Sequence, residues 1–535
     1  PESSAASDVY KRQSLNLGCE NNSENYLKSP FSNLDTLSTN DWWNRDDNPI
    51  INLKVERDEV IAFGIYTVSK NVLKLTAQLF PLYPDETREV ILEIFKNNNW
   101  IEIGRKDINE IGWAITFRVE NWDDSKDVSY RLLHGKNAFF EGLIRKNPLD
   151  KEIITMAAFS CNSNKDRGNR DNYINNINHI DPDILFFAGD QSYDHKEHTA
   201  AWLKFGMQFR EIFRDRPCIT IPDDHDIGQG NLWGESGKIA SSPAGNDGGY
   251  FYDKDYVKMV ERAQTNHLPD PYDSSPIDQG IGVYYTNLQL GGIDFAIIED
   301  RKFKSGPNGK IPQQGPRPDH IRNPDYDPNS INLDNLVLLG ERQLKFLEEW
   351  GKNENFMMKA VLSQTGFCGG AHLHGKKENR LHADLDSNGW PQKGRNKALK
   401  LIKEANAVHI AGDQHLPTVI HHGIKEYEDG PWAFVVPAII NNYYSRWWWP
   451  EDEKKGLNGN NLLPWTGRYK DGFDNKITMH AYANPDSNSN GAGYGIIKFN
   501  KTENNVTFEC WPRFVDVSLE NSKQFDGWPV TVFLD

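Results

Sequence analysis

The sequence is poor in cysteine and has no long apolar run. Its five cysteines are odd in number, widely spaced and without a C-x-x-C pair, which argues against a disulfide framework and a zinc ribbon. No window of about 18 apolar residues occurs, so no transmembrane segment is expected. The first residues lack the charged segment followed by an apolar segment that is typical of a secretion signal. Because the sequence begins with Pro1, a signal that has been removed is still an open possibility.

An excess of basic residues is also absent. Lys and Arg total 60 against 76 Asp and Glu, and the formal net charge is -16. This balance argues against a broad phosphate-tracking surface, so no stable complex with nucleic acid is expected. Hydrophobic residues make up 38% of the chain, with 16 Trp, 20 Tyr and 26 Phe, which indicates a globular protein.

Two hydrophobic patterns divide the 535 residues, a length that suggests more than one domain of about 100 to 200 residues. Segments 60–66 and 72–80 read as strands, and turn residues separate further short strands up to residue 133. This pattern predicts an all-β sandwich domain at residues 46–150, after an N-terminal extension at residues 1–45.

From residue 151 to residue 535, apolar strands are followed by helix-period segments. This order is typical of a buried sheet of mixed direction that is flanked by helices, so the predicted fold class is α/β (α+β). Strands are expected at 153–159, 184–188, 218–221, 295–298, 359–363 and 407–411, and helices at 199–213, 341–350 and 397–405. The segment 305–332, rich in Pro, Asp and Asn, predicts a long loop.

Polar residues capable of chemistry follow each predicted strand. They are Cys161; Gly189, Asp190, Tyr193, Asp194 and His195; Asp223, Asp224, His225 and Asp226; Asp300 and Arg301; Ser363 and Gln364; and Gly412, Asp413, Gln414 and His415. Open α/β sheets bind ligands beyond the carboxyl ends of their strands, so these groups are expected to converge.

Carboxylates and imidazoles in this pattern favour a metal site. A two-metal hydrolytic site needs a carboxylate that bridges cations about 3.5 to 4 Å apart, and Asp190 is the candidate bridge. A buried cluster of carboxylates repels itself unless cations compensate it. A lone Gly-Asp is more often a turn and a lone His more often a structural hydrogen-bonding group, so the prediction depends on their repetition at several strand ends.

The ordered motifs resemble a known family. The sequence looks like the PhoD-like alkaline phosphatase family of metallophosphoesterases in five motifs, which follow one another in this order: Cys161, Gly-Asp190-x-x-Tyr193, Asp-Asp224-His225-Asp226, Asp300-Arg301 and Gly-Asp413-x-His415. The resemblance covers residues 153–535, and the predicted sandwich matches the usual N-terminal domain of that family. It implies a metallophosphoesterase sandwich fold. Two positions depart from the commoner family pattern, since Pro222 stands where Trp is frequent and Asp226 where Glu is frequent.

The resemblance also implies a metal-binding set. Cys161, Tyr193 and Asp190 are expected to bind Fe³⁺, while Asp190, Asp224, Asp413 and His415 are expected to reach Ca²⁺. A phenol with an ordinary pKa near about 10 needs a strong Lewis acid to ionise, and carboxylate oxygens suit calcium. The partition of ligands between the ions is not readable from the sequence.

The predicted reaction is phosphoester hydrolysis. A hydroxide held between the metals attacks phosphorus, His225 protonates or stabilises the leaving group of the bound substrate, and Arg301 forks two hydrogen bonds onto the phosphate. Arg301 as a structural ion-pair partner of Asp300 is an open alternative. The expected substrates are phosphodiesters, phosphomonoesters or both, in a small molecule or a polymer. Family resemblance implies a periplasmic or extracellular enzyme, and a monomer is expected.

Two other functions stay open. Cys161 as nucleophile with His225 as base describes a thiol hydrolase, although nearby carboxylates raise the pKa of a thiol. A secreted binding protein is the second alternative. The roles of two further motifs are also open, namely the histidines His372 and His374 and the aromatic run Trp447, Trp448 and Trp449.

Overall fold

The structure is a computed structural model that describes residues 31, 34–39, 42, 47–371, 381–441, 443, 445–447, 456, 463–486 and 490–535. His372, His374, Trp448 and Trp449 lie outside the described residues. Within the described ranges, four cysteines are free thiols. No helix in these ranges is long and apolar enough to cross a membrane.

Two antiparallel sheets near the N-terminus form the predicted sandwich. Their strands are β1 (Ile61–Ser69), β2 (Val72–Leu79), β3 (Glu89–Lys96), β4 (Asn99–Asp107), β5 (Ala114–Val119), β6 (Val128–His134) and β7 (Ala138–Ile144). One sheet has the order β1-β2-β5 and the other the order β4-β3-β6-β7. Leu75 from the first sheet and Val90 and Leu132 from the second lie in one hydrophobic cluster, so apolar burial holds the two sheets together.

A seven-stranded and an eight-stranded sheet of mixed direction make up the rest of the chain. The seven-stranded sheet contains β8 (Ile153–Asn162), β9 (Ile184–Phe187), β10 (Cys218–Thr220), β19 (Ala438–Ile440), β22 (Gly493–Asn500), β23 (Asn505–Pro512) and β24 (Val530–Phe533). The eight-stranded sheet contains β11 (Thr286–Leu290), β12 (Ile293–Ile297), β14 (Met358–Thr365), β16 (Ala407–Gly412), β17 (Thr418–His422), β18 (Trp432–Val435), β20 (Gly467–Lys470) and β21 (Lys476–Tyr482). A small sheet pairs β13 (His320–Ile321) with β15 (Ala383–Asp384).

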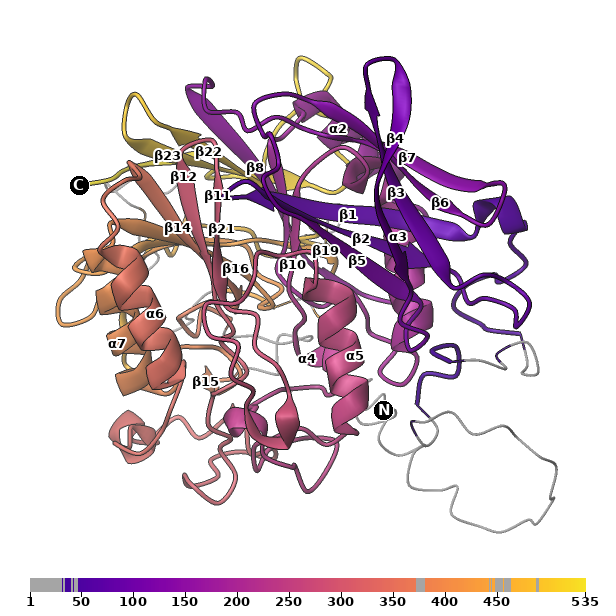
Figure 1. The fold of residues 1–535 in the computed structure, drawn as a ribbon. Helices are drawn as coiled ribbons and strands as arrows, with labels where there is room; N and C mark the ends of the chain where they lie inside the picture. Colours follow the sequence, from indigo (N-terminus) through magenta and orange to yellow (C-terminus); the bar gives the residue numbers. More distant parts are fainter. Residues whose placement is uncertain are drawn as a thin grey trace, which may run out of the picture.

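The two large sheets pack face to face, with helices outside them (Figure 1). On β8, Met156 and Ala158 face the cluster between the sheets, whereas Ala157 and Phe159 face the opposite side. Such alternation buries both faces of a strand. The helices are α2 (Asp171–Ile180), α3 (His198–Phe213), α4 (Asp224–Ile227), α5 (Lys254–Thr265), α6 (Gly340–Gly351) and α7 (Gln392–Glu404).

Helix α3 lies between the seven-stranded sheet and the sandwich. Its Trp202 packs edge-on against Phe63 of β1, with ring centroids 5.6 Å apart. A Cβ on Gly206 would lie 1.9 Å from the Phe63 ring, so only glycine lets the helix approach β1 this closely. On the other side of the molecule, α6 and α7 share a hydrophobic cluster with the outer face of β12, β14 and β16.

The N-terminal extension connects the sandwich to the second region. Trp113 before β5 donates its indole N–H to the Leu37 carbonyl at 2.6 Å. Asp35 accepts hydrogen bonds from the backbone and hydroxyl of Thr199 in α3, at 3.0 and 2.7 Å. The extension therefore fastens the start of α3 to the sandwich.

The predicted fold class is confirmed, since an all-β sandwich precedes mixed sheets flanked by helices. Each strand expected in the second region exists, as do the three expected helices. Helices α2, α4 and α5 were not predicted, and neither were strands β11, β13, β15 and β17 to β24. The domain bounds at 1–45, 46–150 and 151–535 stay predictions.

Candidate metal centre

The predicted ligands lie where strands of both large sheets end. Cys161 is near the end of β8, Asp190 follows β9, Asp224 begins α4 after β10, and Asp413 follows β16. Strands β8, β9 and β10 are parallel neighbours, so their carboxyl ends meet at one edge.

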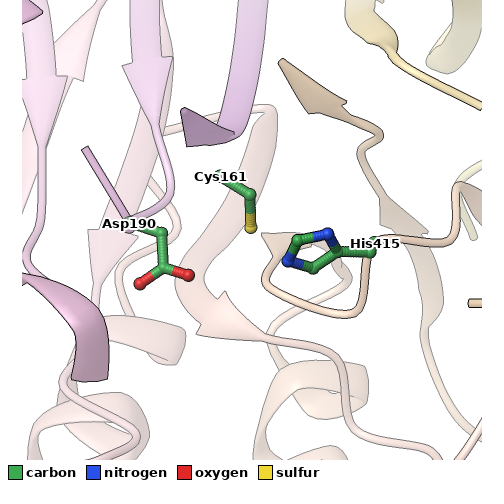
Figure 2. Close-up of side chains that lie close together, drawn as sticks. All are labelled: Cys161, Asp190 and His415. Atoms are coloured by element: carbon green, nitrogen blue, oxygen red, sulfur yellow. The ribbon is translucent and has the colours of Figure 1, made fainter. Parts of the chain in front are cut away.

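Cys161, Asp190 and His415 form a first group. One candidate ligand atom from each lies within 4.8 Å of the others, and Figure 2 shows the three side chains directed toward one another. The Tyr193 hydroxyl joins them, since it lies 2.8 Å from Asp190 Oδ2 and 3.2 Å from His415 Nε2. His415 Nδ1 lies 3.3 Å from Asn441 Oδ1, which leaves Nε2 for the centre.

A second group shares Asp190 with the first. Carboxylate oxygens of Asp190, Asp223, Asp224 and Asp413 lie within 4.8 Å of one another, and His225 forms a further group with Asp190 and Asp224. Asp190 is thus the one carboxylate common to all three groups, the arrangement expected of a bridging ligand.

The backbone at these ligands is unusual. Cys161, Asp190, Asp413 and His415 have φ angles of 56°, 60°, 66° and 52°, in the left-handed region. Each such residue costs about 1–2 kcal/mol relative to the right-handed region. Backbone strain that is concentrated at the ends of different strands is typical of a functional site.

The repeated Gly-Asp has a steric reason. A Cβ on Gly189 would lie 2.5 Å from the Cβ of Asp223, and one on Gly412 would lie 2.2 Å from the Ser160 hydroxyl oxygen. Glycine therefore allows the strand ends to approach until the carboxylates that follow them meet.

The carboxylates of this centre lack sufficient compensation from the described residues. Burial raises the pKa of Asp190 well above its usual range, and Asp224 and Asp223 raise it further. Burial likewise raises the pKa of Asp224 well above its usual range. Asp224 Oδ1 is buried without a hydrogen-bond partner among the described residues. A cation at this position would satisfy that oxygen and offset the repulsion, so the donor set fits metal ions.

Cys161 and Tyr193 are poor acids in these surroundings. Burial and then Asp190 raise the pKa of the Cys161 thiol well above its usual range, and the same two causes raise the pKa of Tyr193. Cys161 is only 1% exposed, and its sulfur contacts the Ser160 hydroxyl at 3.0 Å. An adjacent cation is the influence that would reverse both shifts.

Arg301 is surrounded by carboxylates. Its guanidinium donates to both oxygens of Asp223 at 2.6 and 3.2 Å and to both oxygens of Asp386 at 2.6 and 3.3 Å. A further contact of 3.1 Å reaches Asp413 Oδ2. Among the residues that the structure describes, Arg301 therefore pairs with Asp223 and Asp386 and not with Asp300, the partner that the sequence left open. The Asp300 carboxylate instead accepts the backbone N–H groups of Gln364 and Thr365 at 3.0 Å each.

Three residues of the centre had no assigned role in the sequence analysis. Asp386 pairs with Arg301, and Lys304 donates to the Asp386 and Ser387 carbonyls at 2.5 and 3.0 Å. Asp226 accepts backbone N–H groups of Asp190, Ser192 and Asp223 at 2.8 to 2.9 Å. Asp226 stands two residues after the predicted ligand Asp224, whereas Asp386 lies in a segment to which no site role was assigned from the sequence.

A protein-family model matches part of this sequence. Residues 203–446 match the family model described as PhoD-like phosphatase. The resemblance to PhoD-like phosphatases is confirmed. The PhoD-like segment contains Asp224, His225, Arg301, Asp413 and His415, whereas Cys161, Asp190 and Tyr193 precede it.

Solved structures share the fold. A structure of PhoD aligns with a TM-score of 0.62 at 13% identity, covering 90% of this chain and 92% of that one. The purple acid phosphatase PPD1 from yellow lupin (Lupinus luteus) seeds aligns with a TM-score of 0.52 at 12% identity, covering 88% of this chain and 74% of that one. No curated protein matches the sequence. The family match supports a phosphoesterase function, and the solved structures show the shared fold.

Proposed function

We propose that the chain is a metal-dependent phosphoester hydrolase that acts on phosphodiesters, phosphomonoesters or both. The observation that carries this proposal is the convergence of five other candidate ligands on Asp190, where Asp224 Oδ1 is buried without a hydrogen-bond partner in the described part of the chain. On the family resemblance we also propose a periplasmic or extracellular location and a monomeric state.

Cys161, Tyr193 and Asp190 would hold Fe³⁺, and Asp190, Asp224 and Asp413 would hold Ca²⁺. The family resemblance implied Ca²⁺ for His415; we propose Fe³⁺ instead, since its Nε2 lies 3.2 Å from the Tyr193 hydroxyl. Thiolate, phenolate and imidazole suit a transition metal, whereas carboxylates suit calcium. When bound, the ions would supply Lewis-acid activation of water and neutralise charge on the phosphate.

His225 is proposed to donate a proton to the leaving oxygen. Its ring stacks on the Tyr193 ring with centroids 4.2 Å apart, and a ring nitrogen lies close to Asp190 and Asp224. A general acid must lie within hydrogen-bond reach of the oxygen that departs, and this position borders the centre where a phosphate would lie.

Arg301 is proposed to hold carboxylates rather than the phosphate. It is 1% exposed, and its donors already face Asp223, Asp386 and Asp413. A planar guanidinium matches carboxylates in this paired geometry, so its effect on the reaction would be to fix the position of Asp413.

The thiol-hydrolase alternative lacks geometric support. His225, its proposed base, belongs to the group around Asp190 and Asp224 and not to the group that contains Cys161. The raised pKa of Cys161 also disfavours a thiolate in the protein alone.

The test is hydrolysis of p-nitrophenyl phosphate and bis-p-nitrophenyl phosphate by the purified protein, before and after chelation, with calcium and iron restored separately. Chelator-sensitive turnover is expected, and the two substrates rank monoester against diester activity. Chelator-resistant turnover that thiol alkylation blocks would make Cys161 the nucleophile. Absence of turnover with metals bound would favour the binding-protein alternative.

A further inference from the structure

His195 contacts His225 directly, although the mechanism above assigns it no role. His195 Nε2 lies 2.6 Å from His225 Nδ1, and the ring centroids are 4.8 Å apart. This distance is that of a hydrogen bond between ring nitrogens, so one imidazole donates to the other.

The contact between His195 and His225 leaves one ring nitrogen of His225 able to bind another group. One ring face stacks on Tyr193 at an interplanar angle of 29°, and Nδ1 is taken by His195. The hydrogen bond that one ring nitrogen of an imidazole makes determines whether the other ring nitrogen carries a proton. With Nδ1 engaged, Nε2 is the atom of His225 that remains for the leaving group.

His195 is itself held by several elements. Its carbonyl accepts the Tyr256 hydroxyl of α5 at 3.0 Å. A Cβ on Gly228, which ends α4 with a φ of 90°, would lie 2.5 Å from that carbonyl oxygen. The short helix that carries His225 and the loop that carries His195 are therefore packed backbone to backbone.

The N-terminal extension fastens the next residues of the same loop. Thr36 donates its backbone N–H and its hydroxyl to the Glu197 carboxylate at 3.2 and 2.9 Å, and the Asp35 backbone N–H donates to the Lys196 carbonyl. These contacts fix the loop backbone at and after His195, so the loop can present the His195 ring to His225 in a reproducible position.

We propose that His195 is a positioning residue for His225, which selects the tautomer and ring orientation in which His225 Nε2 delivers a proton to the leaving oxygen. This inference rests on the proposed function. Among the described residues, the His195 side chain hydrogen-bonds to His225 and not to a candidate metal ligand, so its effect would pass through His225.

The test compares His195→Ala, His195→Gln, His225→Ala and the His195→Ala/His225→Ala double variant, each loaded with metal, on aryl and alkyl phosphate esters. We expect His195→Ala to lower kcat about 10- to 100-fold with little change in metal content, the usual effect of removing an orienting partner. The loss should be greater for the alkyl ester, because a poor leaving group depends more on protonation. His195→Gln should recover part of the rate, since its amide oxygen can accept the hydrogen bond from His225 Nδ1.

The double variant should be no slower than His225→Ala, because the two residues act as one unit. Multiplicative losses, equal losses for aryl and alkyl esters, or loss of metal from His195→Ala would overturn the proposal. Failure of the proposed function is separable. If wild-type protein with metal bound hydrolyses no ester, ¹⁵N NMR of the histidine side chains still decides whether His195→Ala changes the His225 tautomer, and an unchanged tautomer would refute the positioning role.

Discussion

Two kinds of buried carboxylate lie at the same end of the sheets, and they differ in whether groups of the protein donate hydrogen bonds to their oxygens. Asp226 is surrounded by donors of the chain itself, namely three backbone N–H groups and the Gln264 amide at 3.0 Å. Asp224, two residues earlier, has a buried oxygen with no such partner in the described part of the chain. The first kind is satisfied by the chain itself, and we propose that the second kind is satisfied by a bound cation.

Asp471 is a carboxylate of the first kind that lies away from the centre. It is buried and accepts the backbone N–H groups of Gly369, Phe473 and Asn475, each at 2.9 Å. It therefore serves as a matched control for the candidate ligands, because its loss removes a buried carboxylate without touching the ligand groups.

The largest expected effect is on Asp190. Asp190→Ala should reduce turnover by well over about 100-fold and lower bound metal, because removal of a mere orienting group costs about 10- to 100-fold. Activity assays and metal analysis measure both effects. Asp471→Asn should keep its metal, and His225→Ala should keep metal while slowing turnover. Full metal loss from the His225 variant would contradict this division of roles.

Substitution of Arg301 tests how much the stability of the protein depends on pairing the buried carboxylates with this guanidinium. Arg301→Met leaves the carboxylates of Asp223 and Asp386 buried without their partner, so the free energy of unfolding should fall by about 3–5 kcal/mol. Arg131→Met on β6 removes a partly exposed pair with Glu93 at 2.6 Å and should cost about 1 kcal/mol or less. Urea denaturation compares the two. Equal costs would show that the centre does not depend on Arg301.

Metal removal tests the unsatisfied carboxylates. Ions that bind only the folded state stabilise it by about 2.7 kcal/mol at a hundredfold excess over Kd, so chelation should lower Tm. Asp224→Asn should lose much of this dependence, while Asp471→Asn should retain it. A Tm that chelation leaves unchanged in the wild-type protein would count against metal binding at this site.

The smallest effect is expected for substitution of glycine. A pair of variants separates the steric requirement for glycine from its conformational preference for positive φ. Gly189→Ala places a Cβ 2.5 Å from Asp223 at a φ of 111°, and a loss of about 1–3 kcal/mol is expected, with weaker metal binding. Gly135, in the turn after β6, has a φ of 59° and nothing within 4 Å of its Cβ position. Gly135→Ala should cost about 1 kcal/mol and leave metal binding intact. Metal titration of the two variants decides whether close approach at Gly189 matters.

The sequence predicted the strands that carry the ligands because each is a short apolar run that ends in polar residues. Strand β8 needs apolar residues on both faces, so 153–159 was recognisable, and the chemistry begins where that run stops at Cys161. In contrast, β22 pairs with β8 across more than 300 residues, and no local pattern specifies such a pairing.

The partners of Arg301 and His225 were harder to predict for a related reason. Asp386 comes from a loop more than 80 residues after Arg301, and His195 lies 30 residues before His225. Side chains from loops meet according to how the backbone folds between them, and periodicity carries no information about that path. Residue types at strand ends therefore indicated the chemistry, whereas orienting contacts required the structure.

The most direct measurement is anomalous X-ray diffraction from crystals of the metal-loaded protein, recorded on both sides of the iron edge, with calcium assigned from its own anomalous signal and coordination. We expect an iron peak among Cys161, Asp190, Tyr193 and His415, and a calcium position among Asp190, Asp224 and Asp413. Absence of metal density at both positions in active protein, or metal bound only elsewhere, would contradict the central claim that Asp190 bridges a metal centre.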